Sequence, residues 1–157
     1  MKKMIVCITF LCLMGCEYFA NEIDKIIEEM EKDEIIDISD SLVGIDSNNI
    51  GIRDDIEYYI NHLNETDKVK NELKKGAKSL QHILTTTLDE KIAYQILLQN
   101  NKIGLCLFFL KDSFDLEDEL IRRTFNTKKR YEQYLNYNKL LDGTTFPVDI
   151  GEHNCDS

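Results

Sequence analysis

Apolar side chains recur at helical spacing along residues 52–141, and no proline interrupts them, because the only proline in the chain is Pro147. Apolar residues three and four positions apart lie on one side of an α-helix, whereas strands need alternation. Short connections between such helices favour antiparallel neighbours. The pattern therefore predicts an all-α fold: a bundle of four to five mostly antiparallel helices with an extended C-terminal tail.

Polar capping residues indicate where individual helices begin, and a segment rich in loop-forming residues indicates a break between helices. Thr66 or Asp67 can cap one helix, Asp89 another, and Asp115 a last long one that continues past residue 131. An earlier stripe within 23–30 predicts a further helix, and residues 37–51 are rich in Ser, Asn, Asp and Gly, which predicts a loop. Residues 103–110 are apolar on every side, so we expect that helix at the centre of the bundle.

The N-terminus is a different kind of segment. Lys2 and Lys3 precede an apolar run, Met4 to Gly15, and the chain turns acidic directly after Cys16. A membrane-spanning helix needs roughly 20 apolar residues, whereas runs of about 7–15 are typical of the h-region of a signal peptide. A cleaved leader explains the run better than a membrane span or an uncleaved N-terminal helix.

The end of this run carries the most specific motif in the chain. Leu13, Met14, Gly15 and Cys16 resemble the lipobox of bacterial lipoproteins, although Met14 is an uncommon occupant of its position. The resemblance implies cleavage after Gly15 and acylation of Cys16, which would anchor the protein in a lipid bilayer. The expected organisation is a cleaved signal peptide at 1–15, a lipidated tether at 16–22, a helical bundle domain at 23–142 and a tail at 143–157.

Charge is distributed unevenly along the chain. Residues 17–57 carry 14 acidic and three basic residues, a net charge of −11, whereas residues 58–157 sum to −1. Such an acidic segment is either repelled by anionic lipid, which would extend a tether, or forms a solvated helix face. Nucleic acid is excluded as an expected partner, because its recognition requires a basic surface.

Two cysteines remain outside the leader and Cys16. Cys106 lies in an apolar helix and can behave as a small buried hydrophobe, while Cys155 is close to the C-terminus. An extracytoplasmic compartment permits a disulfide between them, but sequence fixes no distance, so a disulfide and two free thiols both stay open.

No catalytic or metal-binding constellation is evident. His62 and His82 have no acidic or cysteine partner at ligand spacing, and His153 with Cys155 lacks the second ligand pair of a zinc site. Phosphate-binding loops and hydrolase motifs are missing from the sequence as well. We expect no enzyme activity, no metal and no cofactor; an extracytoplasmic enzyme would need a polar cleft around a histidine.

Basic residues form two clusters, which could bind an anionic polymer such as a glycosaminoglycan or a host protein. The alternative is that they pair with acidic residues of the same chain. The first cluster recurs at i, i+4, i+8, and the second is interleaved with aromatic residues. The residues are Lys70, Lys74 and Lys78, then Arg122, Arg123, Lys128, Lys129 and Arg130.

The lysine-led leader, the lipobox at Cys16 and the Lys/Glu/Asn/Ile-rich helical body together resemble the small outer-surface lipoproteins of spirochaetes, especially borrelial ones. This resemblance implies a lipid-anchored protein of the outer membrane, exposed to a vertebrate or arthropod host, with a role in adhesion, immune evasion or colonisation. The other expectation is a periplasm-facing lipoprotein that serves as a structural or assembly subunit of the envelope.

Overall fold

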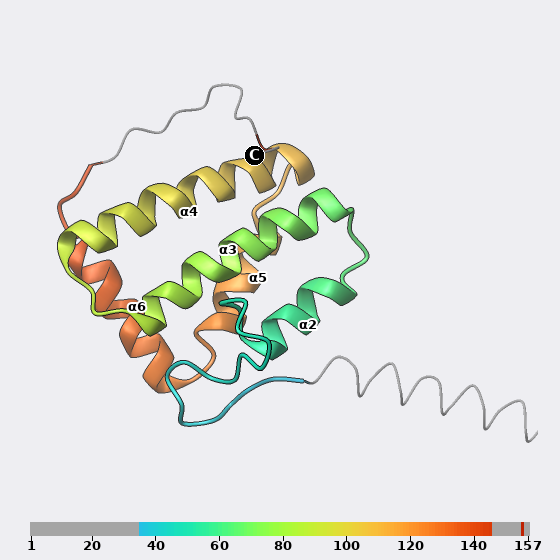
Figure 1. Ribbon diagram of the computed structural model, residues 1–157. Helices are drawn as coiled ribbons and strands as arrows, with labels where there is room; N and C mark the ends of the chain where they lie inside the picture. The colour runs from blue at the N-terminus through green and yellow to red at the C-terminus, as the bar shows by residue number, and fades with distance from the viewer. Residues whose placement is uncertain (1–34, 146–154, 156–157) are drawn as a thin grey trace, which may run out of the picture. The chain divides into compact units, whose positions relative to one another are not determined.

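The computed structural model describes residues 35–145 and Cys155, and it is all-helical in this part of the chain. Five helices lie within the described residues (Figure 1), which confirms the predicted fold class. They are α2 (Asp54–His62), α3 (Asp67–Thr85), α4 (Glu90–Lys111), α5 (Asp115–Thr124) and α6 (Lys128–Leu140). The helix expected within 23–30 and most of the tail expected from 143 lie outside the described residues.

Helix starts follow local side-chain chemistry. The Thr66 hydroxyl accepts a hydrogen bond from Val69 N at 3.4 Å, and the Asp89 carboxylate accepts one from Ile92 N at 2.7 Å. Each bond satisfies one of the backbone N–H groups that a helix leaves unpaired at its first turn. The predicted caps of α3 and α4 are thereby confirmed.

The last long helix of the prediction is two helices. Asp115 is the first residue of α5 and not its cap, and α5 ends at Thr124. Thr127 then caps α6, where its hydroxyl accepts from Arg130 N at 3.4 Å. A continuous stripe of apolar and aromatic residues across this break suggested one helix, but the capping threonine starts a new helix in a different direction (Figure 1).

The central helix is α3, not α4 as its apolar sequence suggested. Helix α3 packs against all four other described helices, and α4 lies beside it, antiparallel across the short connection 86–89 (Figure 1). Part of the apolar surface of α4 stays exposed, with Leu98 at 39% and Phe109 at 56% exposure. The buried core is drawn mainly from α2, α3 and α4; it contains Ile52, Ile56, Ile60, Val69, Leu73, Ala77, Leu80, Ile83, Leu84, Ala93, Ile96, Ile103, Leu107, Leu120, Phe125 and Tyr137.

Candidate binding surface

Two arginines are completely buried, which is unusual for this residue type. Arg53 precedes α2 and Arg130 lies in the first turn of α6; both are at 0% exposure. A buried guanidinium must find partners for its five N–H donors, or its burial is strongly unfavourable. The hydrogen-bond partners of Arg53 and Arg130 therefore show which segments of the chain each arginine holds in place.

Arg53 joins the start of α2 to the end of α5. Its guanidinium donates to both carboxylate oxygens of Asp55, at 2.5 and 2.9 Å. It also donates to the backbone carbonyls of Thr124 at 3.1 Å and Arg123 at 2.9 Å. Carbonyls at the end of a helix have no partner within the helix, so a cation there satisfies them and complements the helix dipole.

Arg130 holds the irregular segment that precedes α2. Its guanidinium donates to the backbone carbonyl of Asp37, to that of Ser41 at 2.9 Å and to that of Leu42 at 3.3 Å. A further bond to the side-chain oxygen of Asn126, at 2.8 Å, comes from the loop before α6. One side chain thus supplies hydrogen bonds to several backbone groups of a segment that forms no helix or strand.

Asp37 links the two arginine sites. Its backbone N–H donates to Asp55 at 2.9 Å, and its carboxylate lies 3.2 Å from the Arg130 guanidinium. Burial acts to raise the pKa of Asp37, but hydrogen bonds from Ser39 and the charge of Arg130 outweigh it and lower the pKa to about 2. The carboxylate is therefore ionised at neutral pH, and the ion pair is intact.

Gly44 lets this segment pass over Arg53. Its φ is +77°, and a Cβ there would overlap the Arg53 side chain and lie 2.6 Å from Asp37 Oδ2. A residue with a side chain is disfavoured at this φ, so the close approach requires glycine. Next to it, the Val43 carbonyl accepts from the Gln81 side chain of α3 at 2.7 Å, which fixes the segment to the central helix.

The anchored segment exposes apolar side chains. We call residues 36–46 the presented loop; its backbone is held by the bundle, yet Ile36 is 41%, Ile38 76%, Val43 40% and Ile45 61% exposed. Clustered apolar residues on a surface are typical of interaction sites, and a loop on a rigid scaffold is where binding residues concentrate. The described part of the chain has no larger group of exposed aliphatic residues within one segment.

Acidic residues accompany this apolar surface. Within the presented loop Asp40 is exposed and Asp46 is partly exposed, and Asp54 and Glu57 are partly exposed in the first turn of α2. Hydrogen bonds from Ser47 lower the pKa of Asp54, which keeps it ionised. The surface around the presented loop is therefore apolar, with several carboxylates and the exposed Lys129 ammonium beside it.

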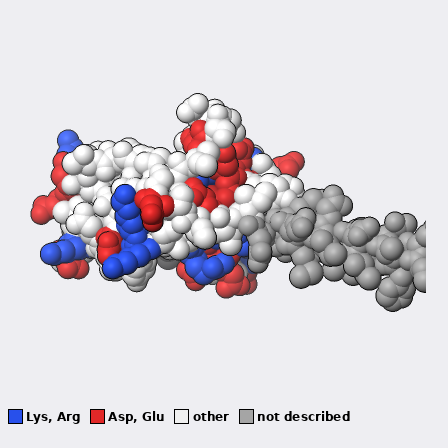
Figure 2. Space-filling model, turned by 90° about the horizontal axis from the view of Figure 1, so that it is seen from below, with Lys and Arg blue, Asp and Glu red and all other residues white. Residues whose placement is uncertain are grey.

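The predicted lysine cluster on α3 is only partly exposed. Lys78 is exposed, whereas Lys70 and Lys74 are half-buried, and the Lys70 ammonium donates to the carbonyl of Asn61 at 2.8 Å. On the face seen in Figure 2, basic side chains lie singly or in small groups, several of them beside acidic ones, and they form no continuous basic field. The three lysines share one side of α3 without forming a uniformly exposed basic field.

The second basic cluster divides by burial and pairing. Arg130 is interior, so it does not contribute to a surface patch. Arg122 and Arg123 both pair with Glu119, at 2.6 Å, and Arg123 also lies over the Tyr59 ring at 4.1 Å. The other two are exposed: Lys128 is 3.8 Å from Glu132, and Lys129 donates to the Asp40 carbonyl at 3.3 Å.

The histidines make local contacts. His62 bonds to the carbonyl of Tyr58 at 2.8 Å and stacks on its ring, while His82 is exposed near the end of α3. No group of three or more metal-ligating side chains gathers within residues 35–145 and Cys155. His153 lies outside the described residues.

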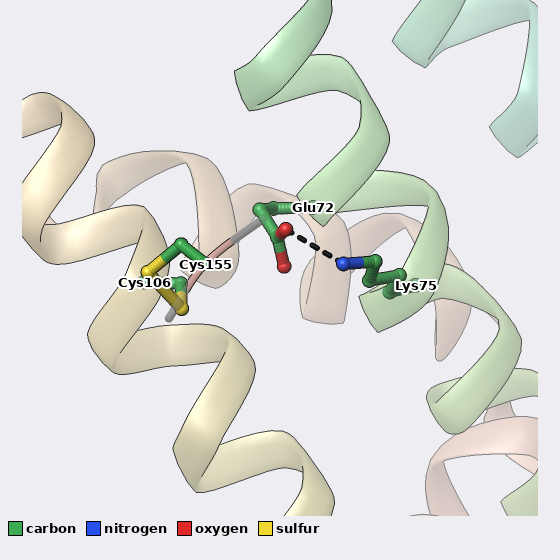
Figure 3. The surroundings of a disulfide bond; sticks show 4 residues. All are labelled: Glu72, Lys75, Cys106 and Cys155. Atoms are coloured by element: carbon green, nitrogen blue, oxygen red, sulfur yellow. Dashed lines mark hydrogen bonds and ion pairs between the residues drawn. A yellow bond between two sulfur atoms is a disulfide. The ribbon is translucent and has the colours of Figure 1, made fainter. Parts of the chain in front are cut away.

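Cys106 and Cys155 are joined by a disulfide with Cα atoms 5.7 Å apart (Figure 3). The alternative that the sequence left open is thereby decided in favour of the bond. Cys106 belongs to the buried side of α4, so the bond attaches residue 155 to the helical bundle.

The lipobox residues Leu13, Met14, Gly15 and Cys16 lie outside the described residues. Among the described helices, none is long and apolar enough to cross a membrane. Comparisons with protein-family models, curated proteins and solved structures found no match to this chain.

Proposed function

We propose that this chain is a lipid-anchored protein of a bacterial outer membrane that binds a host or vector macromolecule without catalysing a reaction. The proposal combines the sequence pattern Leu13 to Cys16 with the properties of the described helical body. Two or more acyl chains on one cysteine give stable membrane attachment, whereas a single chain gives only reversible binding. The helical body would then be displayed outside the cytoplasm.

The observation that carries this compartment is the disulfide between Cys106 and Cys155. Structural disulfides persist in oxidising compartments and are rare in the cytosol, where thiols are kept reduced. The bond supports export on grounds that do not depend on the leader sequence. Leader and disulfide therefore favour the same location for independent reasons.

The presented loop is the binding surface that we assign to this function. Its backbone is fixed before any partner arrives, so ordering it would cost little conformational entropy on binding. Its exposed isoleucines can enter apolar pockets, and the neighbouring carboxylates favour basic residues around those pockets. We infer a protein partner with an apolar, basic-rimmed surface; a glycosaminoglycan, which is polyanionic, is disfavoured at this loop.

Replacement of Cys16 tests the anchor. In cells grown with labelled palmitate, the wild-type protein should carry label and sediment with membranes, whereas Cys16→Ala should lose both properties. Cys12→Ala, a change within the leader that leaves Leu13 to Cys16 intact, is the matched control and should keep both. Label on the Cys16→Ala protein would refute acylation at this residue.

Protease treatment of intact cells tests the side of the membrane. Surface display predicts cleavage of the protein while periplasmic marker proteins survive. Full protection alongside cleavage of known surface proteins would instead support a periplasm-facing structural or assembly subunit, the second function that the lipobox allows.

The loop is tested with a soluble body that starts at Glu17, screened against purified host plasma and extracellular-matrix proteins. For a partner found in this way, Ile38→Ser combined with Ile45→Ser should weaken binding about tenfold or more. Leu135→Ser, at an α6 position that is 49% exposed, is the control and should bind normally. Equal affinity for all three proteins would place the binding surface elsewhere.

A further inference from the structure

A hollow lies between α3 and α4, beside the disulfide. Four of its lining residues, Gln99, Lys102, Ile103 and Cys106, follow the i, i+3, i+4, i+7 spacing of one face of α4, and Glu72 and Lys75 line it from α3. Cys155 completes the wall, so the hollow depends on the disulfide as well as on the two helices (Figure 3).

The floor of the hollow is apolar and its rim is charged. Ile103 is 7% and Cys106 2% exposed, whereas Gln99 and Lys102 are exposed at the rim. The hollow is partly open to solvent, and its volume is about 160 Å³, below the roughly 300 Å³ at which sites for drug-sized ligands begin. Only a small molecule fits such a space.

The charged side chains that line the hollow indicate whether its ligand is an anion or a cation. Glu72 is 3% exposed, and its carboxylate is matched by the Lys75 ammonium at 2.9 Å (Figure 3). Lys102 forms no hydrogen bond or ion pair with the part of the chain that the structure describes. Among the described lining residues, the charges of Glu72 and Lys75 cancel, and the positive charge of Lys102 remains.

We propose that this hollow binds a small aliphatic monocarboxylate. The carboxylate meets the Lys102 ammonium and the Gln99 amide at the rim, and the aliphatic part covers Ile103 and the disulfide. A charge-assisted hydrogen bond at the rim and apolar burial at the floor together match a molecule with one anionic and one apolar end. This inference goes beyond binding of a macromolecule and does not depend on the presented loop.

Butyrate is a suitable probe, with butanamide and butylammonium of nearly equal size as neutral and cationic analogues. Titration of the oxidised soluble body, followed by amide NMR, should give saturable shifts confined to residues around 72–75 and 99–106 for butyrate. The two analogues should bind at least about tenfold more weakly, because they lack the negative charge.

Three variants locate the site. Lys102→Gln should weaken butyrate binding about tenfold, while Lys91→Gln, an exposed lysine near the start of the same helix, should leave it unchanged. Cys155→Ser removes the bond to the far wall and should also weaken binding in a protein whose other amide resonances are preserved. Equal binding of butanamide, or unchanged affinity in Lys102→Gln, would overturn the proposal. Failure here leaves membrane anchoring and loop binding intact, because they are measured on other residues.

Discussion

Gly44 lies directly over the aliphatic part of the Arg53 side chain, and a methyl group at Gly44 would occupy the same space. Because Gly44 has no side chain, the irregular segment can run close across the buried Arg53. It also makes the position of the presented loop sensitive to a single carbon atom.

Gly44→Ala should destabilise the protein by about 3 kcal/mol or more, from backbone strain at positive φ together with overlap. Gly143 has the same φ of +77° but nothing within 4 Å of an added Cβ, so Gly143→Ala isolates the strain and should cost only about 1 kcal/mol. Urea unfolding of both variants measures the difference. Equal losses of unfolding free energy in the two variants would mean that the protein relieves the overlap with Arg53 at no cost in stability.

Arg130→Met should release the presented loop, because the carbonyls that Arg130 holds would lose their donor and Asp37 would lose its cation. Removing one partner of a buried ion pair costs about 3–5 kcal/mol. Amide hydrogen exchange should accelerate most within residues 36–46. Lys128→Met, two residues away with a 90% exposed side chain, is the control and should exchange like the wild type.

Acid should weaken the attachment of the presented loop to Arg130, because it protonates Asp37. Its pKa is lowered from 3.8 to about 2 in the folded protein, so the folded state favours the ionised form. The resulting stabilisation is fully present above pH 3.8 and is lost as the pH falls toward 2. Unfolding free energy measured between these values should fall less steeply for Asp37→Asn than for the wild type; parallel curves would contradict the assignment.

Glu117 should have the opposite effect. Burial, helped by the charge of Asp118, raises the pKa of Glu117, and its carboxylate lies against Gly104 of α4. A raised pKa means that ionisation is less favourable in the folded state, so this group lowers stability increasingly as the pH rises through its folded pKa. Glu117→Gln should therefore raise the melting temperature at pH 7 and have a smaller effect in acid. Glu132→Gln, at an exposed site, should give no such pH-dependent gain.

Reduction of the disulfide should destabilise the protein by about 4 kcal/mol, the chain-entropy figure for a loop closed between Cys106 and Cys155 at a sequence separation of 49. Thermal unfolding with and without a dithiol reductant measures the loss. Cys155→Ala should unfold at the same temperature as the reduced wild type and should not respond to reductant. A reductant effect that persists in this variant would have another origin.

Helices were predictable where the determinants are local. The threonine before α3 and the aspartate before α4 cap their helices as expected, because capping depends on residues three positions apart. Thr127 offered the same signal before α6, but the continuous stripe of Phe125, Tyr131 and Leu135 hid the break. The capping threonine indicated a new helix and the apolar stripe indicated a continuous one. The prediction followed the stripe and was wrong.

The anchoring of the presented loop could not be read from the sequence. Arg130 stands in a basic run beside Lys128 and Lys129, and nothing local distinguishes a buried guanidinium from an exposed one. Its main partners are Asp37, Ser41 and Leu42, nearly ninety positions or more away. The disulfide could not be predicted from the sequence either, because two cysteines can form a bond only where the fold brings their α-carbons close together.

A tethered protein is also loaded mechanically. If the chain is anchored through Cys16, tension that arrives along the chain from its N-terminal side reaches Asp37 early in the described residues, and the buried Arg130 side chain holds Asp37. Within the part of the chain that the structure describes, Arg130 would then be an early point of resistance to tension. Detachment of the loop under force would remove the binding surface while the core helices stayed folded, so the bond to a host would give way before the protein does.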